Sequence, residues 1–283
     1  MKLIDGKMIA VQKLLTVKET IENKDLTPAL AVVLVGDDPA SHLYVKLKQK
    51  AAKEVGVELR TYFCEALTPR DEIVQSINFL NADPDTHGII VQLPLPDHLD
   101  ADEIVNMIDP QKDADGFHRV NQEKFLADEE GVFPVFPRAI MSLIDSCGDD
   151  LRGKNAVVLG KSDVFDRVMT HALVQRGCET QFIRCVDKKD FSPKEKELIN
   201  SADIIVTAAG MPEFVSCDLI KDDTIVIDGG ISKKGEKIMG DIAQKTCKDR
   251  DIILSPVPGG VGPVTIACLL ENAVELAQKQ REL

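Results

Sequence analysis

The sequence lacks the long apolar runs that mark membrane proteins. No run approaches the roughly 20 apolar residues that a membrane-spanning helix needs, so we expect no transmembrane segment. The amino-terminal residues contain no apolar core of the kind found in signal peptides, so we expect none here either. Repeats and low-complexity tracts are also missing, which excludes repeat and fibrous architectures.

Paired or clustered cysteines are absent as well. The seven cysteines are scattered along the chain without a CxxC pair, and CxxC pairs or clusters are the usual mark of zinc sites and disulfide frameworks. We therefore expect reduced thiols in a cytoplasmic protein, and no metal site. The five histidines are isolated from one another and from the cysteines, so we interpret them as structural or surface residues.

An excess of positive charge is the third absence. The formal net charge is −13, and because proteins that bind nucleic acid are usually basic, we expect no nucleic-acid partner. With 44% hydrophobic and 29% charged residues, the composition is that of a soluble globular protein. A chain of 283 residues suffices for one large domain or two ordinary ones.

What the sequence does contain is a repeated alternation of strand and helix patterns, which predicts an α/β fold with two parallel sheets. In the first half we expect a helix at 7–22, a strand at 29–35 and a helix that is capped by Ser41, runs to about Val55 and stops at Gly56. A strand at 57–63, a helix capped by Thr68, a strand at 88–92 and a helix at 100–108 are expected to follow.

The second half repeats this order and predicts a Rossmann-like, doubly wound sheet. We expect a strand at 155–160, a helix at 166–176 capped by Asp166, a strand at 180–183, a helix opened by the capping box Ser192–Glu195, strands at 204–208, 224–228 and 252–254, and a last helix at about 264–281. A Pro-rich segment leads into a helix that runs through Ile144. The domain boundary is expected between about 117 and 140, and the last helix is long enough to return to the first domain.

One strand ends in a feature that indicates a site. The apolar run Gly88–Val91 is followed by the amide of Gln92 and by a stiff turn at Leu93–Pro96. Sites in open α/β sheets lie beyond the carboxyl ends of the strands, so Gln92 is expected to face a crevice. A buried strand followed by a rigid turn without function explains the same stretch.

Tyr44 and Lys48 are four residues apart on a predicted helix and therefore share one face. Tyr-xxx-Lys spacing also occurs in short-chain dehydrogenases, but there a glycine-rich strand-turn-helix precedes it, and none precedes Tyr44. Lys48 alone is typical of a solvated surface. It becomes a candidate only together with Gln92.

The turn that begins at Gly160 lies where a dinucleotide-binding turn is expected, after a strand and before a helix. Only the first glycine of such a turn is present. Asp166 is a good helix cap, but its carboxylate would repel a pyrophosphate and fill the amide site that binds one. A structural turn without a cofactor explains this segment equally well.

Taken together, these stretches resemble the methylenetetrahydrofolate dehydrogenase/cyclohydrolase family of the bacterial FolD type. The resemblance runs from Leu3 to the last helix. Its specific motifs are Asp37-Asp38-Pro39-Ala40-Ser41 with Tyr44-Val45 and Lys48, Gly88 with Val91-Gln92-Leu93-Pro94-Leu95-Pro96, Lys112-Asp113-Ala114-Asp115-Gly116-Phe117, and Pro256-Val257-Pro258-Gly259-Gly260-Val261-Gly262-Pro263-Val264-Thr265.

The resemblance implies two domains joined across a cleft, a homodimer and a folate substrate. Residues 1–117, completed by 264–283, would form the folate-binding catalytic domain, and 118–263 the Rossmann-like NAD(P)-binding domain. Lys48 would be the catalytic group, Gln92 its hydrogen-bond partner, Tyr44 the contact of the aminobenzoyl ring and Asp115 the acceptor for the pterin. The other implied substrate-binding residues are Leu93, Pro94, Pro258, Gly259, Gly260 and Gly262.

The nucleotide side departs from the family pattern. The residues implied to bind NADP are Gly160, Lys161, Ser162, Arg184 and Ile231, and the altered positions are Val135, Phe136, Asp166, Val168 and Arg184. Lys161 and Arg184 could still pair with a 2′-phosphate. Phe136, however, adds bulk near the nicotinamide, and Asp166 opposes the pyrophosphate.

The implied function is the interconversion of 5,10-methylene-, 5,10-methenyl- and 10-formyltetrahydrofolate by a dehydrogenase and a cyclohydrolase. One alternative is a cyclohydrolase that has lost or weakened its NADP-dependent step, because only the folate-side residues are intact. A second alternative is a folate-binding pseudoenzyme, against which the intact Tyr44, Lys48, Gln92 and Asp115 argue.

Overall fold

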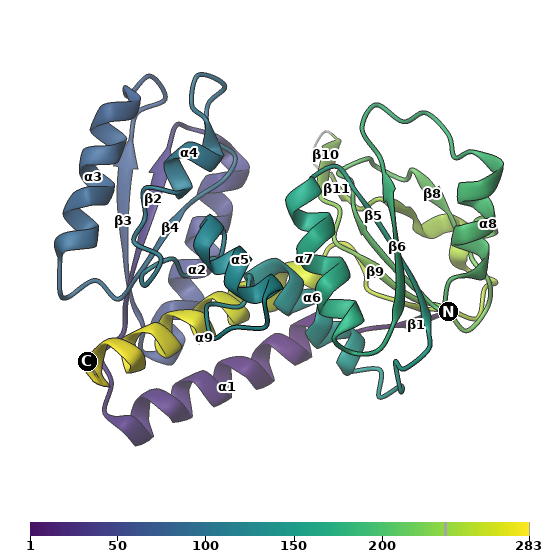
Figure 1. Cartoon of the computed structure of the whole chain (residues 1–283), viewed down its shortest axis with the longest axis horizontal. Coiled ribbons are helices and arrows are strands. Elements are labelled where there is room, and N and C mark those ends of the chain that lie inside the picture. Colours follow the sequence, from purple (N-terminus) through teal and green to yellow (C-terminus); the bar gives the residue numbers. More distant parts are fainter. Residues whose placement is uncertain (235–236, 283) are drawn as a thin grey trace. The chain divides into compact units, whose positions relative to one another are not determined.

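The computed structural model describes residues 1–234 and 237–282 and contains two compact units (Figure 1). We call Val11–Val135 with Ile266–Leu283 the three-stranded unit, and Met1–Ala10 with Phe136–Thr265 the six-stranded unit. This division differs from the predicted one. Residues 118–135 belong to the three-stranded unit, and the first ten residues belong to the six-stranded unit, because their strand pairs with its sheet.

The three-stranded unit is built on a parallel sheet in the order β3-β2-β4. β2 (Ala29–Val35) and β4 (Gly88–Val91) are buried along their whole length, which is why they read as continuous apolar runs. β3 (Glu58–Cys64) lies at the edge opposite β4 and is less buried. The crossovers are made by α2 (Pro39–Val55) and α3 (Arg70–Ala82), as the alternating pattern predicts.

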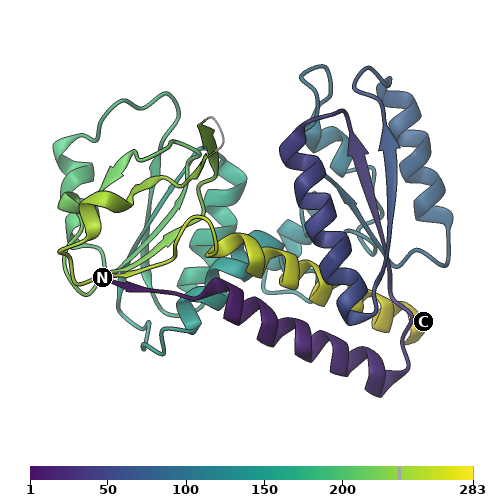
Figure 2. The same ribbon diagram turned by 180° about the vertical axis from the view of Figure 1, so that it is seen from behind.

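The first and last long helices lie side by side in both views of the chain (Figures 1 and 2). They are α1 (Gly6–Lys24) and α9 (Val261–Glu282), and an ion pair of 2.9 Å joins Lys13 to Glu271. The amide of Asn272 on α9 donates to two backbone oxygens of the three-stranded unit. Most of the last helix therefore belongs to the three-stranded unit. The short helices α4 (Ala101–Val105) and α5 (Arg119–Leu126) complete this unit.

The apolar spacing on α1 predicted the helix but not its buried face. Met8, Val11 and Leu15 are each more than half exposed, whereas Val17 and Ile21 are buried. The buried face of α1 therefore carries fewer large side chains than the exposed one.

The six-stranded unit contains a wholly parallel sheet. Its strand order is β1 (Lys2–Leu3), β13 (Ile253–Leu254), β9 (Ile225–Asp228), β7 (Ile204–Ala208), β5 (Asn155–Gly160) and β6 (Glu179–Arg184). Its long helices are α6 (Val135–Asp145), α7 (Asp163–Val174) and α8 (Pro193–Ser201). The predicted α/β class with a Rossmann-like second sheet is confirmed, and only β1 lacked a sequence signal.

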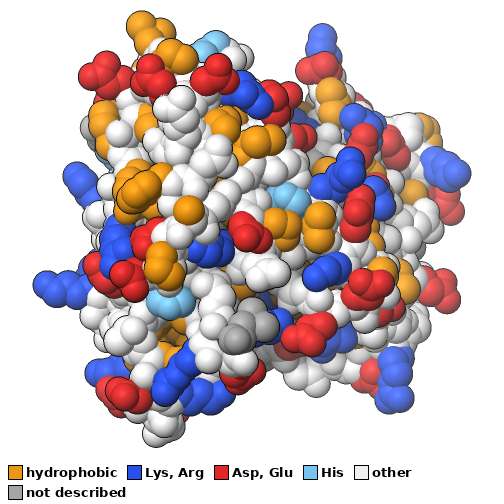
Figure 3. Space-filling model, turned by 60° about the vertical axis from the view of Figure 1, so that its left-hand side comes forward, with side chains coloured by type: hydrophobic (Ala, Val, Ile, Leu, Met, Phe, Trp, Pro, Cys, Tyr) orange, Lys and Arg blue, Asp and Glu red, His pale blue; other side chains and the backbone are white. Residues whose placement is uncertain are grey.

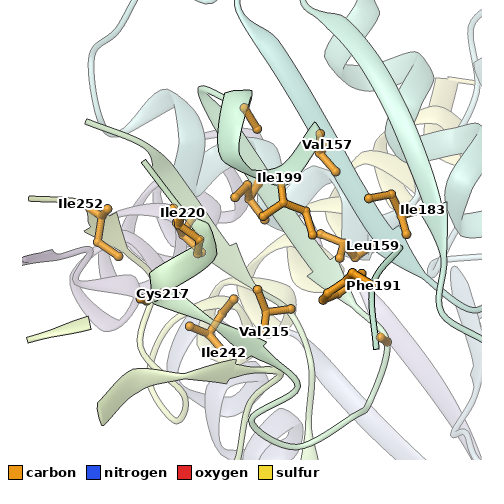
Figure 4. Packing of buried hydrophobic residues seen from close by; sticks show 14 of the residues in the cluster. Val157, Leu159, Ile183, Phe191, Ile199, Val215, Cys217, Ile220, Ile242 and Ile252 are labelled. Carbon is orange, nitrogen blue, oxygen red and sulfur yellow. The ribbon is translucent and has the colours of Figure 1, made fainter. Parts of the chain in front are cut away.

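The core on one face of this sheet joins strands to α8 (Figure 4). Val157 and Leu159 from β5 pack with Ile183 from β6 and Ile199 from α8, and Phe191 closes the group. All of these side chains are almost fully buried. The apolar residues alternate along β5 so that one set faces this cluster, as expected for a strand covered on both sides.

Short elements at the border of this core bring two cysteines together. They are β8 (Val215–Ser216), η1 (Cys217–Leu219), β12 (Ile242–Ala243) and η2 (Gln244–Cys247). β10 (Ser232–Lys234) and β11 (Lys237–Met239) form a separate antiparallel pair. β8 pairs with β12, and Cys217 and Cys247 form a disulfide with a Cα–Cα distance of 5.1 Å. The expectation of reduced thiols throughout is therefore wrong for this pair, whose proximity depends on strand pairing over 30 residues.

Several predicted helix ends are displaced by a few residues. α3 begins at Arg70 after Pro69, without the expected side-chain cap from Thr68. α4 is shorter than predicted and ends at Val105, while α9 begins at Val261, before the expected start. Local cap signals locate the helices correctly but not their first residues.

The surface mixes both signs of charge with apolar side chains. On the face shown in Figure 3, acidic and basic groups alternate, and hydrophobic side chains lie exposed between them. Within the described ranges, no helix is both long and apolar enough to cross a membrane.

Candidate active site

Helix α2 presents Tyr44 and Lys48, and its amino end is capped by Asp38. The Asp38 carboxylate accepts a hydrogen bond from the Ser41 backbone N–H at 2.7 Å, and Pro39 opens the helix. Ser41 was therefore wrongly predicted as the N-cap. A proline suits the first helical position because its φ is already helical and its missing N–H has no partner to lose there.

Lys48 and Gln92 form the central contact of the site. Lys48 Nζ donates a hydrogen bond to Gln92 Oε1 at 2.9 Å, and both side chains are buried. Gln92 Nε2 donates to the backbone oxygen of Leu93 at 2.7 Å, which turns the amide oxygen toward the lysine. Burial lowers the pKa of Lys48, with the charge of Asp115 acting in the opposite direction. The site therefore holds a lysine that loses its proton more easily than a surface lysine does.

Asp115 lies in a loop that runs along β4. Ala114 N donates to Ile89 O at 3.1 Å, so the strand and the loop are fixed to each other. Burial raises the pKa of Asp115 to about 6, the charge of Lys48 opposes this, and the charge of Asp113 adds to it. The predicted set of Lys48, Gln92 and Asp115 is thus gathered within one unit.

Asp113 shapes this loop, a role that the sequence analysis missed. Its carboxylate is buried and accepts hydrogen bonds from Gly116 N at 3.1 Å, His118 N at 2.8 Å and Asn121 Nδ2 at 2.9 Å. Burial raises its pKa. The available signal was an aspartate three residues before a glycine in a loop, where this side chain commonly bonds nearby backbone amides.

Ser41 is a second residue that the sequence analysis did not assign to the site. Its side chain is buried, and its hydroxyl has no hydrogen-bond partner among the described residues. It lies three residues before Tyr44 on α2, so the two share a helix face. Tyr44 is half-buried, and burial raises its pKa. Of the other predicted contacts, Leu93 is half-buried and Pro94 is exposed.

The predicted glycine-rich loop belongs to the six-stranded unit. Pro258 is exposed, Gly259 has a φ of 106° that favours glycine, and Gly260 is buried. A Cβ at Gly260 would lie 2.6 Å from the Pro256 backbone oxygen, so the glycine is needed for close packing. Gly262 lies in the first turn of α9.

The turn after β5 differs from its sequence prediction. The N-cap of α7 is Ser162, whose hydroxyl accepts from Phe165 N at 3.4 Å, and not Asp166. Asp166 lies in the first turn and accepts a hydrogen bond from Thr170 Oγ1 at 3.1 Å, while burial raises its pKa. Ser162 therefore caps the helix in place of Asp166, because α7 begins three residues before the predicted start.

The positive residues near this turn lie at neighbouring strand ends. Gly160 pairs in register with Arg184 across β5 and β6, and Lys161 follows Gly160 directly. Both cations are exposed, and Arg184 forms an ion pair with Asp163 of α7. Ile231, also predicted to lie at this site, is exposed in the segment between β9 and β10.

Aromatic rings cover the same edge of the sheet. Phe136 and Phe165 lie with ring centroids 5.4 Å apart. A Cβ on Gly160 would lie 3.2 Å from Phe165 Cδ1, and one on Gly229 would lie 2.8 Å from Phe136 Cζ. The rings therefore rest on the glycines at the ends of β5 and β9. The other two altered residues, Val135 and Val168, are buried.

Comparisons with known proteins agree with this geometry. Family models for the tetrahydrofolate dehydrogenase/cyclohydrolase catalytic domain and NAD(P)-binding domain match residues 4–115 and 134–281. The chain is 38% identical to the bifunctional protein FolD of Nitratiruptor sp. over 99% of both chains. The chain belongs to the tetrahydrofolate dehydrogenase/cyclohydrolase family. Its relatives also include FolD of Moorella thermoacetica, at 39% identity over 98% of this chain and 99% of the other.

Solved structures of FolD proteins share the whole fold. FolD of Campylobacter jejuni superimposes with a TM-score of 0.90, with 38% identity and 99% coverage of both chains. The FolD enzyme of Trypanosoma brucei, solved with NADP and an inhibitor, gives a TM-score of 0.91 at 28% identity, covering 99% of this chain and 98% of the other. These comparisons favour dehydrogenase plus cyclohydrolase over a cyclohydrolase alone and over a pseudoenzyme.

NADP is the cofactor of this family, and the residues of the turn fit it at one end. Lys161 and Arg184 are adjacent cations that suit a phosphate monoester. The amino end of α7 is less suited to the pyrophosphate, because Ser162 occupies an amide and Asp163 and Asp166 add negative charge. Across the described ranges, no group of three or more His, Cys, Asp or Glu could hold a metal ion.

Proposed function

We propose that the site on α2 and β4 performs the cyclohydrolase step of this folate enzyme and holds the substrate for the dehydrogenase step. The observation that supports this is the buried Lys48, bonded to Gln92 and facing the charge of Asp115. Together the two steps interconvert 5,10-methylene-, 5,10-methenyl- and 10-formyltetrahydrofolate.

Lys48 serves as the base or proton relay. In the cyclohydrolase step, water adds to the cationic methenyl carbon, and the water must lose a proton as the new C–O bond forms. A lysine whose pKa is lowered by burial can accept that proton, and a nearby substrate cation would lower its pKa further. Gln92 holds the amine in place and, being neutral, does not stabilise its charged form.

Asp115 and the residues around it bind the folate. An ionised carboxylate accepts hydrogen bonds only, so Asp115 suits the amino and ring N–H groups of a pterin. Tyr44 offers a half-buried ring for the aminobenzoyl group, and the buried Ser41 hydroxyl offers an unused polar group on the same helix. Leu93 and Pro94 are the remaining proposed contacts in this unit, and Pro258, Gly259, Gly260 and Gly262 stay predictions from the family resemblance.

The nucleotide is proposed to bind through the carboxyl edge of the six-stranded sheet. When bound, NADP accepts the hydride from the folate methylene carbon. Lys161 and Arg184 would hold its 2′-phosphate, with Arg184 exchanging its partner Asp163 for the phosphate. Gly160, Ser162 and Ile231 are the proposed neighbours of the rest of the cofactor.

The decisive experiment compares Lys48→Met with Lys46→Met. Both lysines lie on α2, but Lys46 is exposed and Lys48 is buried against Gln92. We expect Lys48→Met to lower cyclohydrolase kcat by about 10²- to 10⁴-fold, the usual contribution of a general base. Lys46→Met should leave it unchanged. Equal activities of the two variants would exclude the proposed role of Lys48.

The dehydrogenase half is tested separately, by following NADP reduction with 5,10-methylenetetrahydrofolate. Normal turnover is expected even though Phe136, Phe165 and Asp166 lie at the nucleotide edge. Hydrolysis of 5,10-methenyltetrahydrofolate without any NADP reduction would instead support a cyclohydrolase alone.

A homodimer and a cytoplasmic location complete the proposal. The free edge of β3 and the exposed Leu43, Leu47 and Phe63 support a dimer, because a strand edge beside apolar side chains is a common contact surface. Phe63→Lys is expected to reduce the mass found by light scattering, whereas Phe79→Lys on α3 should not. Free thiols at Cys64, Cys147, Cys178 and Cys185 support the cytoplasmic location.

A further inference from the structure

Two buried carboxylates lie at the carboxyl edge of the six-stranded sheet and take no part in the chemistry proposed above. Asp228 is the last residue of β9, and Asp241 directly precedes β12. Each is 1% exposed. Burying two acids near each other is costly unless they are fully hydrogen-bonded, so their partners show what they stabilise.

Asp241 holds the loop that follows β7. Its Oδ2 accepts from Ala209 N at 2.7 Å, and its Oδ1 accepts from Met211 N at 2.6 Å. These amides belong to the first residues beyond the end of the strand at Ala208. Both ends of the segment 209–211 are therefore fixed by one side chain.

Asp228 holds the loop that follows β9 and ties it to the segment around Asp241. It accepts from Gly230 N at 3.1 Å and from the backbone N–H groups of Asp241 and Ile242 at 3.0 Å. The Thr207 hydroxyl donates to Asp228 Oδ1 at 3.2 Å and also bonds to the Asp241 carboxylate. Thr207 thus connects both acids to β7.

Glycines press against both carboxylates. A Cβ at Gly230 would overlap the Asp241 carboxylate, and one at Gly240 would overlap the Asp228 carboxylate. Burial raises the pKa of Asp228 to about 6 and also raises that of Asp241, while the surrounding amides lower both. The backbone at Gly230 and Gly240 therefore packs directly against the two carboxylates, and no larger residue fits at either glycine.

The loops that these acids hold border the point where the sheet reverses its strand order. β5 lies between β6 and β7, so the loops after β5 and β7 leave the sheet in opposite directions. Dinucleotides bind at this point in doubly wound sheets. The loop at 209–211 is therefore one side of the nucleotide position, and Gly229–Gly230 directly follows the neighbouring strand β9.

We propose that Asp228 and Asp241 are positioning residues for NADP, acting through the loops at 209–211 and 229–230. The proposal rests on the dehydrogenase function proposed above. Neither acid touches the reacting atoms. Both fix the backbone conformation of loops that border the proposed NADP position. Their loss should therefore weaken NADP binding and leave the cyclohydrolase step unchanged.

The test compares Asp241→Asn with Asp203→Asn in the full-length enzyme. The Asp241 carboxylate accepts hydrogen bonds from two backbone N–H groups of the loop. In the asparagine variant one carboxylate oxygen becomes an NH₂ group, which cannot accept, so one of these two hydrogen bonds is lost. Asp203 accepts comparable bonds, from Asn155 N at 2.8 Å and Lys221 Nζ at 2.6 Å, but at the amino ends of β5 and β7. It is therefore a matched control at the opposite edge of the sheet.

We expect Asp241→Asn to raise the KM for NADP by about tenfold, the effect of losing one hydrogen bond to a charged group. Its dehydrogenase kcat at saturating NADP and its cyclohydrolase kcat/KM should stay within about twofold of wild type. Asp203→Asn should lower the melting temperature without changing the KM. Equal KM values in the two variants would overturn the proposal.

A second pair of variants applies if Asp241→Asn does not fold. Thr207→Val keeps the shape of a fully buried side chain but removes the hydroxyl that joins the two acids, and Thr207→Ser restores it. We expect a raised KM for NADP in the first and a wild-type value in the second. A wild-type KM in Thr207→Val would contradict the proposal. Absent NADP reduction by the wild-type enzyme would instead overturn the proposed dehydrogenase function on which it depends.

Discussion

Lys48 is a lysine whose charge is controlled mainly by burial. Its nearest partner is the neutral amide of Gln92, at 2.9 Å, and the carboxylate of Asp115 acts on it only through its charge. A carboxylate in place of the amide would favour the charged form, and a purely apolar neighbour would leave the amine unbound. The amide avoids both, because it orients Nζ while the pKa stays lowered.

Replacing Gln92 with glutamate should therefore raise the pKa of Lys48. Because only the base form of the lysine accepts the proton of water, Lys48 controls the ascending limb of the pH profile. We expect cyclohydrolase kcat/KM at pH 7 to fall and this limb to move to higher pH. The measurement is the pH dependence of methenyltetrahydrofolate hydrolysis by Gln92→Glu and wild type. A profile that does not move would show that Lys48 is not the titrating base.

Asp115 should produce a second limb of the same profile, at lower pH. Its pKa of about 6 means that it is ionised at pH 7 and takes up a proton as the pH falls through 6. A protonated carboxyl has lost part of its capacity to accept hydrogen bonds, so we expect the KM for folate to rise below pH 6. In Asp115→Asn this limb should disappear, with a KM that is high at every pH. Persistence of the limb would assign it to another group.

At the scale of single elements, the amino end of α7 carries negative charges that disfavour the pyrophosphate of NADP. Ser162 caps the helix, and Asp163 and Asp166 stabilise its amino end as acidic residues do. The same charges disfavour a pyrophosphate there. The positive charge that favours NADP comes instead from Arg184 on β6 and from Lys161.

Asp166→Gly should strengthen NADP binding. Removing one negative charge from a helix amino end that faces a phosphate is expected to tighten the Kd by about three- to tenfold, since such charges contribute about 0.3–1 kcal/mol and more when partly buried. Glycine also lowers the stability of α7 by about 1 kcal/mol. Titration calorimetry with NADP measures the first effect, with Asp251→Asn as an exposed control. Unchanged affinity would place the pyrophosphate away from α7.

Local signals in the sequence predicted the elements well because their causes lie within a few residues. The capping box of α8 is present as expected, with Ser192 N donating to Glu195 Oε2 at 2.8 Å. The N-cap of α7 was predicted wrongly because Ser162 and Asp166 are both good caps, and only the direction of the chain leaving β5 decides between them.

Contacts between distant segments could not be predicted from these signals. Asp241 bonds to a loop 30 residues earlier, and the Cys217–Cys247 disulfide depends on the pairing of β8 with β12. Asp113 lies inside a family motif, but its role as the centre of the loop follows only from the backbone geometry. Lys48, Gln92 and Asp115 were found because their motifs are specific and not because the spacing alone places them together.

At the scale of the whole molecule, the chain passes from one unit to the other at three places, near residues 10, 135 and 265. Both α1 and α9 continue through such a place, so each unit contains segments from distant parts of the sequence. The three-stranded unit is therefore not an amino-terminal fragment, although its proposed catalytic residues all lie before residue 116.

A fragment of residues 1–135 should consequently fail to fold, although it contains Lys48, Gln92 and Asp115. It lacks α9, whose buried residues Leu269, Leu270, Ala273 and Leu276 cover the unit, and each large side chain left uncovered costs about 1.5–3 kcal/mol. The Asn272 amide, which bonds to Ala114 O and Phe133 O at 2.9 Å, would also be missing, so the loop of Asp115 would lose a fixed neighbour.

Thermal unfolding followed by circular dichroism tests this expectation. The fragment alone should show no cooperative transition. The free energy of unfolding that it loses without α9 exceeds the few kcal/mol by which small domains are stable. Adding a peptide of residues 264–283 should restore the transition, and a peptide with Asn272→Leu should restore it less, because the two backbone oxygens would stay unpaired. A cooperative transition in the fragment alone would mean that α9 is not part of this folding unit, and that the helix serves only to continue the chain from the six-stranded sheet.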